Sequence, residues 1–139
     1  MTIAVGDALA PFIIDAVSPA AMHEWAVFLH DPNPIHLDAD VVRARGLGDR
    51  VINQGPANVA YLINMLHAAF PGATLAAIES RFIDNVYGGE RVVAAGEIAE
   101  IDADRVTCAL TLTAGDDRIV LTGTATMILS ILTKETPNA

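Results

Sequence analysis

One short segment carries the side chains best suited to chemistry, namely Asp31 and His36 in the run Asp-Pro-Asn-Pro-Ile-His. A carboxylate and an imidazole held close together can share a water molecule, with one taking a proton and the other orienting the water or returning a proton. Pro32 and Pro34 fix two backbone φ angles, which lowers the entropy cost of holding both groups. Asn33 can lock the turn through bonds to the backbone. A plain helix-ending turn, capped by Asp31, is the alternative interpretation.

Gly55 is a second candidate, because it stands before Pro56 at the start of a long apolar segment. The first turn of a helix presents N–H groups without partners, together with a partial positive charge. A glycine there lets a ligand carbonyl approach closely. A carbonyl oxygen bound to the Gly55 N–H would have its developing negative charge stabilised. An ordinary Gly-Pro helix start is the alternative interpretation.

The other histidines and the single cysteine favour structural roles. His23 lies beside the apolar stripe of a predicted helix, and His30 stands at the end of that helix. His67 follows Asn64 by three residues in an apolar helix, a spacing that predicts a hydrogen bond in the core. Cys108 alternates inward on a predicted strand and is interpreted as a small core residue. The sequence has no zinc-ligand spacing, P-loop or dinucleotide fingerprint, so we assign no metal and expect no cofactor.

Composition and charge exclude several classes of protein. The chain has 139 residues, which suits a single domain, and 53% of them are apolar, which excludes disorder over most of its length. The net charge of −9, from 17 acidic and 8 basic residues, opposes non-specific binding to nucleic acid. Arg43, Arg45 and Arg50 form a local basic cluster, which is either a solvated face or a contact for a phosphorylated ligand.

The expected location follows from the cysteine count and from the hydropathy. One cysteine allows no intramolecular disulfide, which fits a reducing compartment. Residues 1–10 lack the basic and apolar regions of a signal peptide, and the most apolar stretch, residues 59–70, is shorter than a membrane span. We therefore expect a cytoplasmic protein with no membrane partner.

The candidate residues stand between predicted helices. Residues 11–17 are interpreted as a strand or extended arm. A helix then starts at Ser18 and must end before Pro32. A short helix is predicted over residues 39–45, after a capping aspartate. The third helix, over residues 55–70, is apolar on nearly every face, which predicts that it is buried.

The second half of the chain has the alternating pattern of strands. Helices followed by consecutive strands are typical of an α+β fold with an antiparallel sheet. The long apolar helix beside such a sheet predicts a single hot-dog domain over residues 1–132, with the sheet wrapped around the helix and a flexible tail at residues 133–139. An open sheet of this kind leaves an edge for a second subunit to cover. The predicted strands cover residues 75–86, 91–101, 105–113 and 118–131.

The candidate loop resembles the motif of a known family. Residues 28–38 read Phe-Leu-His-Asp-Pro-Asn-Pro-Ile-His-Leu-Asp, which is similar to the hydratase motif of the MaoC-like (R)-specific enoyl-CoA hydratases. Those proteins typically read small-Gly-Asp-x-Asn-Pro-Ile/Leu-His, then a short helix and a glycine-containing turn into a central helix. The resemblance extends over residues 17–129, with further matches at Gly46-Leu47-Gly48, at Arg81-Phe82, and at residues 86–90 and 95–98.

The resemblance implies a hot-dog homodimer that hydrates trans-2-enoyl thioesters, or dehydrates 3-hydroxyacyl thioesters, carried by CoA or by a carrier protein. At the matching positions, Asp31 and His36 would activate the water and return a proton, and Gly55 would donate its N–H to the thioester carbonyl. The acyl chain would run along the central helix, and the pantetheine arm would pass between subunits. The residues implied to hold the loop or contact the substrate are Asn33, Gln54, Asn58, Leu62 and Arg81.

Two residues depart from the family pattern. His30 stands before Asp31 where the family usually has glycine, and Gln54 stands before Gly55 where the family usually has histidine. Both changes bear on the substrate more than on the reaction. Two other functions are compatible with the sequence. One is a hot-dog acyl-CoA thioesterase, in which Asp31 activates water, and the other is a non-catalytic acyl-thioester-binding subunit of a heteromeric dehydratase.

Overall fold

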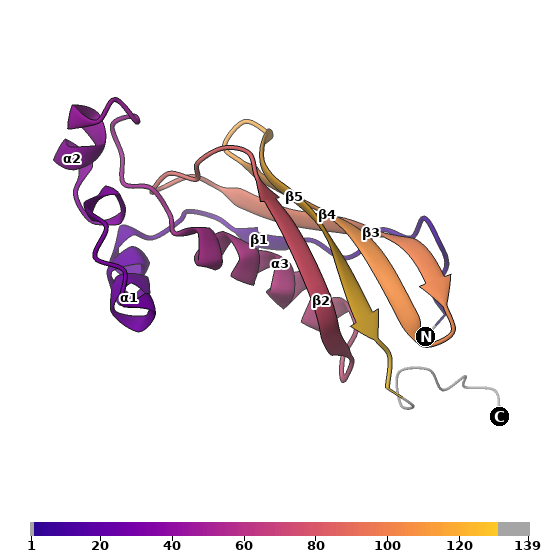
Figure 1. Cartoon of the computed structure of the whole chain (residues 1–139). Helices are drawn as coiled ribbons and strands as arrows, with labels where there is room; N and C mark the ends of the chain where they lie inside the picture. Colours follow the sequence, from indigo (N-terminus) through magenta and orange to yellow (C-terminus); the bar gives the residue numbers. More distant parts are fainter. Residues whose placement is uncertain (1, 131–139) are drawn as a thin grey trace.

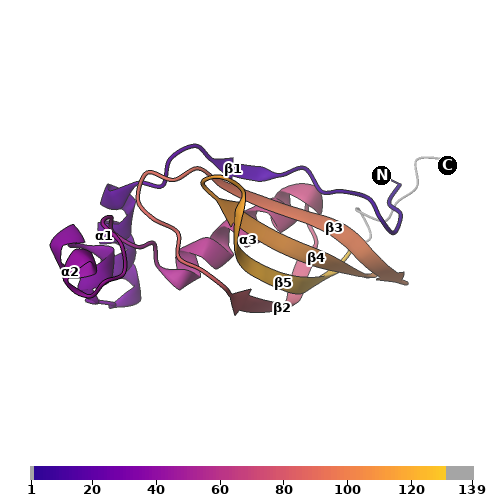
Figure 2. The ribbon, with the colours of Figure 1, turned by 90° about the horizontal axis from the view of Figure 1, so that it is seen from above.

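The structure is a computed structural model that describes residues 2–130. A five-stranded antiparallel sheet curves over one long helix, and two shorter helices lie together beyond one end of the sheet (Figure 1). Seen from above, the long helix crosses beneath the sheet (Figure 2). The predicted α+β architecture, with an antiparallel sheet wrapped around a long helix, is confirmed.

The elements follow one another in an order close to the prediction. The strand order across the sheet is β1-β3-β4-β5-β2, so β1 and β2 form its two edges. The helical elements are α1 (Pro19–Leu29), the 3₁₀ turn η1 (Pro34–His36), α2 (Ala39–Ala44) and α3 (Gly55–Ala69). The strands are β1 (Phe12–Ile14), β2 (Thr74–Phe82), β3 (Val92–Asp102), β4 (Arg105–Ala114) and β5 (Arg118–Ile128).

Two predicted strands are shorter in the structure. The strand predicted over residues 75–86 ends at Phe82, because the amides of Ile83 and Asp84 both donate to the Val120 carbonyl, at 2.9 and 3.2 Å, and the ladder stops there. The strand predicted over residues 11–17 is reduced to three residues, since the chain bends at residues 15 and 16.

The last predicted strand also needs a correction at its end. It runs to Ile128 within the described residues, whereas residue 131 lies outside them. The tail predicted at residues 133–139 likewise lies outside the described residues. Among residues 2–130, none of the helices is long and apolar enough to cross a membrane.

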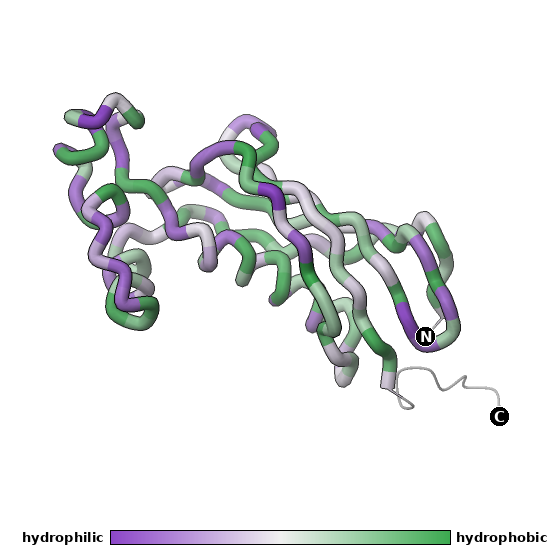
Figure 3. The backbone as a smooth tube through the Cα atoms, viewed as in Figure 1, coloured by the Kyte–Doolittle hydropathy of each residue, from purple (hydrophilic) through white to green (hydrophobic). Residues whose placement is uncertain are grey.

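The core lies between the sheet and α3. Strand β4 alternates as predicted, with Val106, Cys108, Leu110 and Leu112 buried and its threonines half-buried. Apolar segments occur along α3 and along the strands that cover it (Figure 3). Burial raises the pKa of the Cys108 thiol to about 11, so the thiol is protonated at neutral pH and acts as a small apolar core group.

The prediction that the long helix is buried on every side is wrong. Leu62, Met65 and Leu66 of α3 are buried against the sheet. Asn64 and His67, which were expected to form a hydrogen bond in the core, are exposed on the other side of the helix. A sheet on one face covers only about half of a helix, whereas the apolar composition of the helix as a whole suggests full burial.

Candidate active site

The end of helix α1 sets the position of Asp31. Ser18 caps the start of the helix, its Oγ accepting a hydrogen bond from the Ala21 N–H at 3.2 Å. At the other end His30 adopts the left-handed conformation, with φ 51° and ψ 41°. The Asp31 N–H then donates back to the Ala26 carbonyl at 2.9 Å. This left-handed turn stops the helix and starts the loop with the Asp31 carboxylate.

The conformation of His30 explains why glycine suits its position, and it leads to a prediction. A residue with a Cβ pays roughly 1–2 kcal/mol to adopt the left-handed region, which glycine adopts freely. His30→Gly is therefore expected to raise the free energy of unfolding by about 1 kcal/mol, measured by chemical denaturation. His30→Ala is the matched control, because it removes the imidazole and keeps the Cβ. Equal stability of the two variants would contradict the prediction.

Asn33 fixes the loop between the two candidate side chains. Its N–H donates to Asp31 Oδ1 at 3.1 Å, and its own Oδ1 accepts from the Ile35 N–H at 3.2 Å. The second bond caps the 3₁₀ turn η1, which begins at Pro34. The loop predicted between the helices thus contains one helical turn, and this turn brings His36 back toward Asp31.

His36 is held in one tautomer by a backbone carbonyl. Its Nδ1 lies 2.6 Å from the carbonyl oxygen of Ile52, and because a carbonyl oxygen only accepts, Nδ1 carries the proton. In the neutral imidazole Nε2 then has a free lone pair, and it lies 3.5 Å from Asp31 Oδ2. Solvent reaches both groups, since 36% of the Asp31 side chain and 10% of the His36 side chain are exposed.

A second backbone segment holds Ile52 in place. The Ile52 N–H donates to the Ile35 carbonyl at 2.9 Å, and Ile52 pairs with Tyr87 in an isolated antiparallel bridge. The flanking bonds are Asn53 N–H to the Val86 carbonyl, at 2.7 Å, and Gly88 N–H to the Val51 carbonyl, at 2.8 Å. The carbonyl that orients His36 is therefore fixed to the connection between β2 and β3.

Gly55 is the first residue of α3, as predicted, and the helix starts after an extended Gln54. No atom of residues 2–130 accepts a hydrogen bond from the Gly55 N–H, so it is available to a ligand. A Cβ at this position would lie 3.3 Å from the ring of Phe82, so glycine allows that ring to approach the helix start.

The residues around this helix start form a buried polar layer. The Gln54 Nε2 donates to the Met22 carbonyl of α1 at 2.8 Å, while its Oε1 is buried without a hydrogen-bond partner among the described residues. Asn53 Nδ2 donates to Asn58 Oδ1 at 2.8 Å and to the Tyr61 hydroxyl at 3.1 Å. Burial raises the pKa of that hydroxyl, and the Asn53 hydrogen bond offsets part of the rise.

Two of the predicted substrate contacts are not adjacent to the dyad in this chain. Leu62 is wholly buried in the core under the sheet. Arg81 is the neighbour of Phe82 on β2, and Phe82 faces Gly55, so Arg81 points to the opposite face of the sheet. There it lines a shallow polar depression with Glu79. The roles of Leu62 and Arg81 toward a substrate stay predictions.

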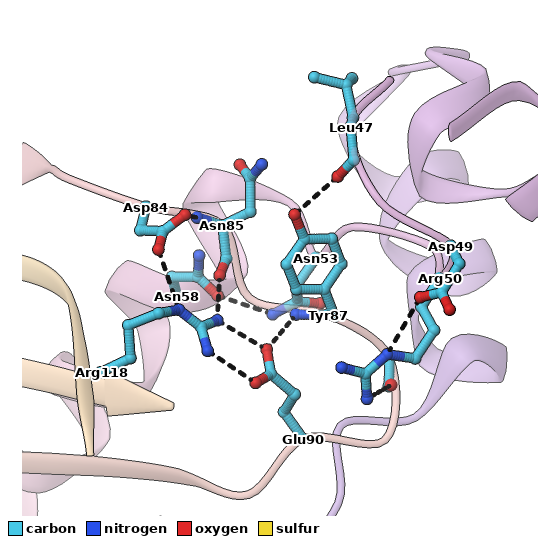
Figure 4. Close-up of polar contacts among 11 residues, drawn as sticks. Leu47, Asp49, Arg50, Asn53, Asn58, Asp84, Asn85, Tyr87, Glu90 and Arg118 are labelled. Carbon is cyan, nitrogen blue, oxygen red and sulfur yellow. Dashed lines mark hydrogen bonds and ion pairs between the residues drawn. The ribbon is translucent and has the colours of Figure 1, made fainter. Parts of the chain in front are cut away.

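Sequence reasoning missed an ion pair that supports the site. Arg118 at the start of β5 binds Glu90 through two bonds of 3.1 and 2.9 Å, and its Nε lies 2.9 Å from Asp84 (Figure 4). Glu90 also accepts the Tyr87 N–H at 2.8 Å, and the Tyr87 hydroxyl donates to the Leu47 carbonyl at 2.7 Å. No local sequence pattern pairs residues that are 28 positions apart. The nearest signal was Glu90 in the Gly-Gly-Glu turn.

The Glu90–Arg118 pair should stabilise the fold in a pH-dependent way. Burial raises the pKa of Glu90, but hydrogen bonds from Arg118 and Tyr87, with the charges of Arg118 and Arg50, outweigh it and lower the pKa from 4.5. A lowered carboxyl pKa contributes stability that is present above 4.5 and is lost as the pH falls through the folded-state value.

We therefore expect Arg118→Ala to lower the free energy of unfolding by about 2 kcal/mol near neutral pH, less than for a fully buried pair because water reaches Arg118. Chemical denaturation over a pH series should show this difference shrinking below pH 4.5. Arg43→Ala removes the exposed Asp40–Arg43 pair of α2 and is the matched control, with an expected cost under about 1 kcal/mol. A difference that is independent of pH would contradict the assignment to Glu90.

Comparison with known proteins identifies the family. The family model described as MaoC like domain matches residues 5–116. The chain belongs to this MaoC-like dehydratase family. No curated protein matches its sequence.

Solved structures share its fold. The (R)-hydratase of A. caviae involved in PHA biosynthesis superimposes with a TM-score of 0.86 at 20% identity, covering 93% of this chain and 98% of the other. The R-hydratase PhaJ1 of Pseudomonas aeruginosa gives 0.81 at 21% identity, covering 91% and 82%. A chain of the ChsH1-ChsH2 complex of Mycobacterium tuberculosis gives 0.83 at 17% identity, covering 93% and 100%. These similarities show that the chain has the hot-dog fold.

Proposed function

We propose that this protein adds water to trans-2-enoyl thioesters, or removes it from 3-hydroxyacyl thioesters, with Asp31 and His36 as the acid–base pair. The observation that carries the proposal is the 3.5 Å approach of His36 Nε2 to Asp31 Oδ2. Both atoms are acceptors when the imidazole is neutral and the carboxylate is ionised, so they cannot bond to each other directly. A water molecule that donates one proton to each satisfies both and is polarised for attack.

Hydration then proceeds in two steps, addition of the water oxygen and delivery of a proton. The water oxygen forms a bond to the β-carbon while one of its protons passes to the dyad. The electron pair of the carbon–carbon double bond moves toward the thioester oxygen, and the Gly55 N–H stabilises the enolate charge that develops there. The dyad next delivers a proton to the α-carbon, and the carbonyl re-forms. The reverse sequence is the dehydration.

The choice of a thioester substrate is supported by the family and by the names of structurally similar proteins. Two are (R)-hydratases, and another, at 16% identity, is a truncated HadBC complex named as a 3R-hydroxyacyl-ACP dehydratase. Both reactions add water to, or remove it from, the same carbon–carbon bond of an acyl chain. Asn33 bonds to Asp31, and Gln54 and Asn58 belong to the buried polar layer at the start of α3. We assign Asn33 to holding the loop and the other two to contacting the substrate.

The test is a direct assay of the purified chain with enoyl-CoA thioesters of several lengths, including branched and bulky acyl groups. Hydration removes the ultraviolet absorbance of the conjugated thioester without releasing thiol. Release of free thiol at the same rate as the loss of absorbance would show that the protein is a thioesterase and not a hydratase. A folded dimer that binds the thioester and turns over none of it would instead be a binding subunit of a heteromeric enzyme.

We further infer a homodimer that joins subunits along β2. This strand is an edge of the sheet, and most of its residues are exposed, which leaves unpaired backbone groups along its length. The apolar side chains of Phe82 and Ile83 are 57% and 54% exposed at its end. Light scattering during size-exclusion chromatography should give twice the chain mass, and a monomer at micromolar concentration would contradict the inference.

A further inference from the structure

One peptide unit lies between two groups of the proposed reaction centre, and it joins Ile52 to Asn53. Its carbonyl oxygen lies 2.6 Å from His36 Nδ1, and its N–H group donates to the Val86 carbonyl at 2.7 Å. Gly55, the first residue of α3, follows Asn53 by two residues. The position of this peptide unit therefore affects both the imidazole and the N–H group of Gly55.

The side chain of Asn53 attaches this peptide unit to helix α3. Its Nδ2 donates to Asn58 Oδ1 at 2.8 Å (Figure 4) and to the Tyr61 hydroxyl at 3.1 Å. An asparagine amide has two N–H donors, so both are used, and two acceptors in different directions hold the amide in one orientation. Asn53 is thus bonded to the connection between β2 and β3 through its backbone and to α3 through its side chain.

Water competes only weakly with these two hydrogen bonds. Asn53 and Asn58 are 4% and 5% exposed. The Tyr61 ring is itself held in place, since it stacks on Phe12 of β1 with the ring centroids 6.3 Å apart. Because a buried acceptor that loses its donor is costly, the three side chains favour a single arrangement.

The backbone hydrogen bonds of this segment run in another direction. Those of residues 51–53 go to Ile35 and to residues 86–88, and within residues 2–130 none of them reaches α3. The pairing with residues 86–88 is an isolated bridge and not a strand ladder. The Asn53 side chain therefore supplies the hydrogen bonds that fix this segment against the helix.

We propose that Asn53 is a positioning residue, which holds the Ile52 carbonyl toward His36 and sets its separation from the Gly55 N–H. The proposal rests on the proposed function, in which His36 acts on the water at the β-carbon and the Gly55 N–H acts on the thioester oxygen. A rigid conjugated chain separates these two substrate atoms, so the two protein groups must keep a matching separation. A displacement of about 1 Å can lower the rate by a factor of about 10².

The first experiment reads the imidazole directly, by NMR of isotope-labelled histidine nitrogens at a pH where the imidazole is neutral. The His36 signals are identified by their absence from His36→Gln, and in the wild type they should show a proton on Nδ1 alone. Asn53→Leu is close in size but cannot donate, so the Ile52 carbonyl is released and both tautomers should appear. Asn64→Leu, on the exposed side of α3, is the matched control and should keep the wild-type signals.

The second experiment measures the hydration of one trans-2-enoyl-CoA. Asn53→Leu should lower kcat by a factor of about 10–100 and leave KM within about twofold, because the residue positions other groups and does not contact the substrate. Asn64→Leu should leave both constants unchanged. Tyr61→Phe removes one of the two acceptors of Asn53 and should lower kcat about threefold at an unchanged KM.

Thermal unfolding checks that each variant is folded. A single Nδ1–H tautomer in folded Asn53→Leu, or a kcat of that variant equal to the wild-type kcat, would overturn the proposal. If Asn53→Leu does not fold, Tyr61→Phe decides, and a kcat equal to that of the wild type would overturn the role of Asn53. Absence of hydration by the wild type would instead overturn the proposed function, and the tautomer of His36 would still test the positioning by Asn53.

Discussion

Replacing Asp31 by asparagine is expected to lower kcat/KM for hydration of a trans-2-enoyl thioester by a factor of about 10²–10⁴, the usual contribution of a positioned general base. The substitution is nearly isosteric, and the new amide oxygen can still accept the Asn33 N–H that closes the loop. The geometry is therefore retained while the group that accepts the proton is lost. The rate is read from the loss of enoyl absorbance.

His36→Gln should produce a loss of the same order, because the glutamine amide can donate to the Ile52 carbonyl but has no basic nitrogen in place of Nε2. The double variant is expected to be little worse than either single variant, since the two groups act on one water molecule as a unit. Losses that multiply in the double variant would show two independent roles and contradict the shared water.

Asp38→Asn is the matched control for these variants. Asp38 caps α2 by accepting the Asp40 N–H at 2.9 Å, on the same segment but outside the dyad. The change removes the same carboxylate charge, and an asparagine caps a helix about as well. Activity close to that of the wild type is expected. If Asp38→Asn lost as much activity as Asp31→Asn, general damage to the loop would explain both results.

Gly55→Pro is expected to lower kcat by a factor of about 10²–10³, the cost of removing one hydrogen bond donor to a developing oxyanion. Proline has no N–H, and its fixed φ suits the first residue of a helix. The preceding Gln54 is already extended, with φ −68° and ψ 143°, as a residue before proline must be. The substitution therefore removes the donor with little change to the backbone of α3.

Gly55→Ala distinguishes loss of the N–H donor from crowding by a new side chain. Alanine keeps the N–H and brings a Cβ to 3.3 Å from the Phe82 ring, as the proline would. It should lose less activity than Gly55→Pro, and circular dichroism with thermal unfolding should show both variants folded. Equal losses for alanine and proline would assign the effect to crowding at Phe82 and remove the role of the Gly55 N–H.

The parts of this molecule that could be predicted from sequence are those encoded locally. Ser18 and Pro19 define the start of α1, and the alternation of β4 defines its buried face. The two prolines and Asn33 predicted a tight turn that holds Asp31, and hydrogen bonds of 3.1 and 3.2 Å form that turn. Such features depend on a few neighbouring residues, so a pattern of residue types is enough to predict them.

The parts that could not be predicted depend on contacts between distant segments. The partner of His36 is the backbone of Ile52, and a backbone atom has no signature in residue types. The Arg118–Glu90 pair joins segments that only the strand order brings together. Helix α3 is apolar over most of its length, so the exposure of Asn64 and His67 depends on how much of the helix one sheet covers.

The hydrogen bond between His36 and the Ile52 carbonyl also affects how this site can change during evolution. The imidazole is oriented by a main-chain oxygen, so a change of side chain at position 52 leaves the orienting atom in place. Sequence drift at that position can alter the neighbouring surface without altering the tautomer of His36. A backbone contact of this kind tolerates mutation and cannot be detected by comparing residue identities, because it is inherited with the fold.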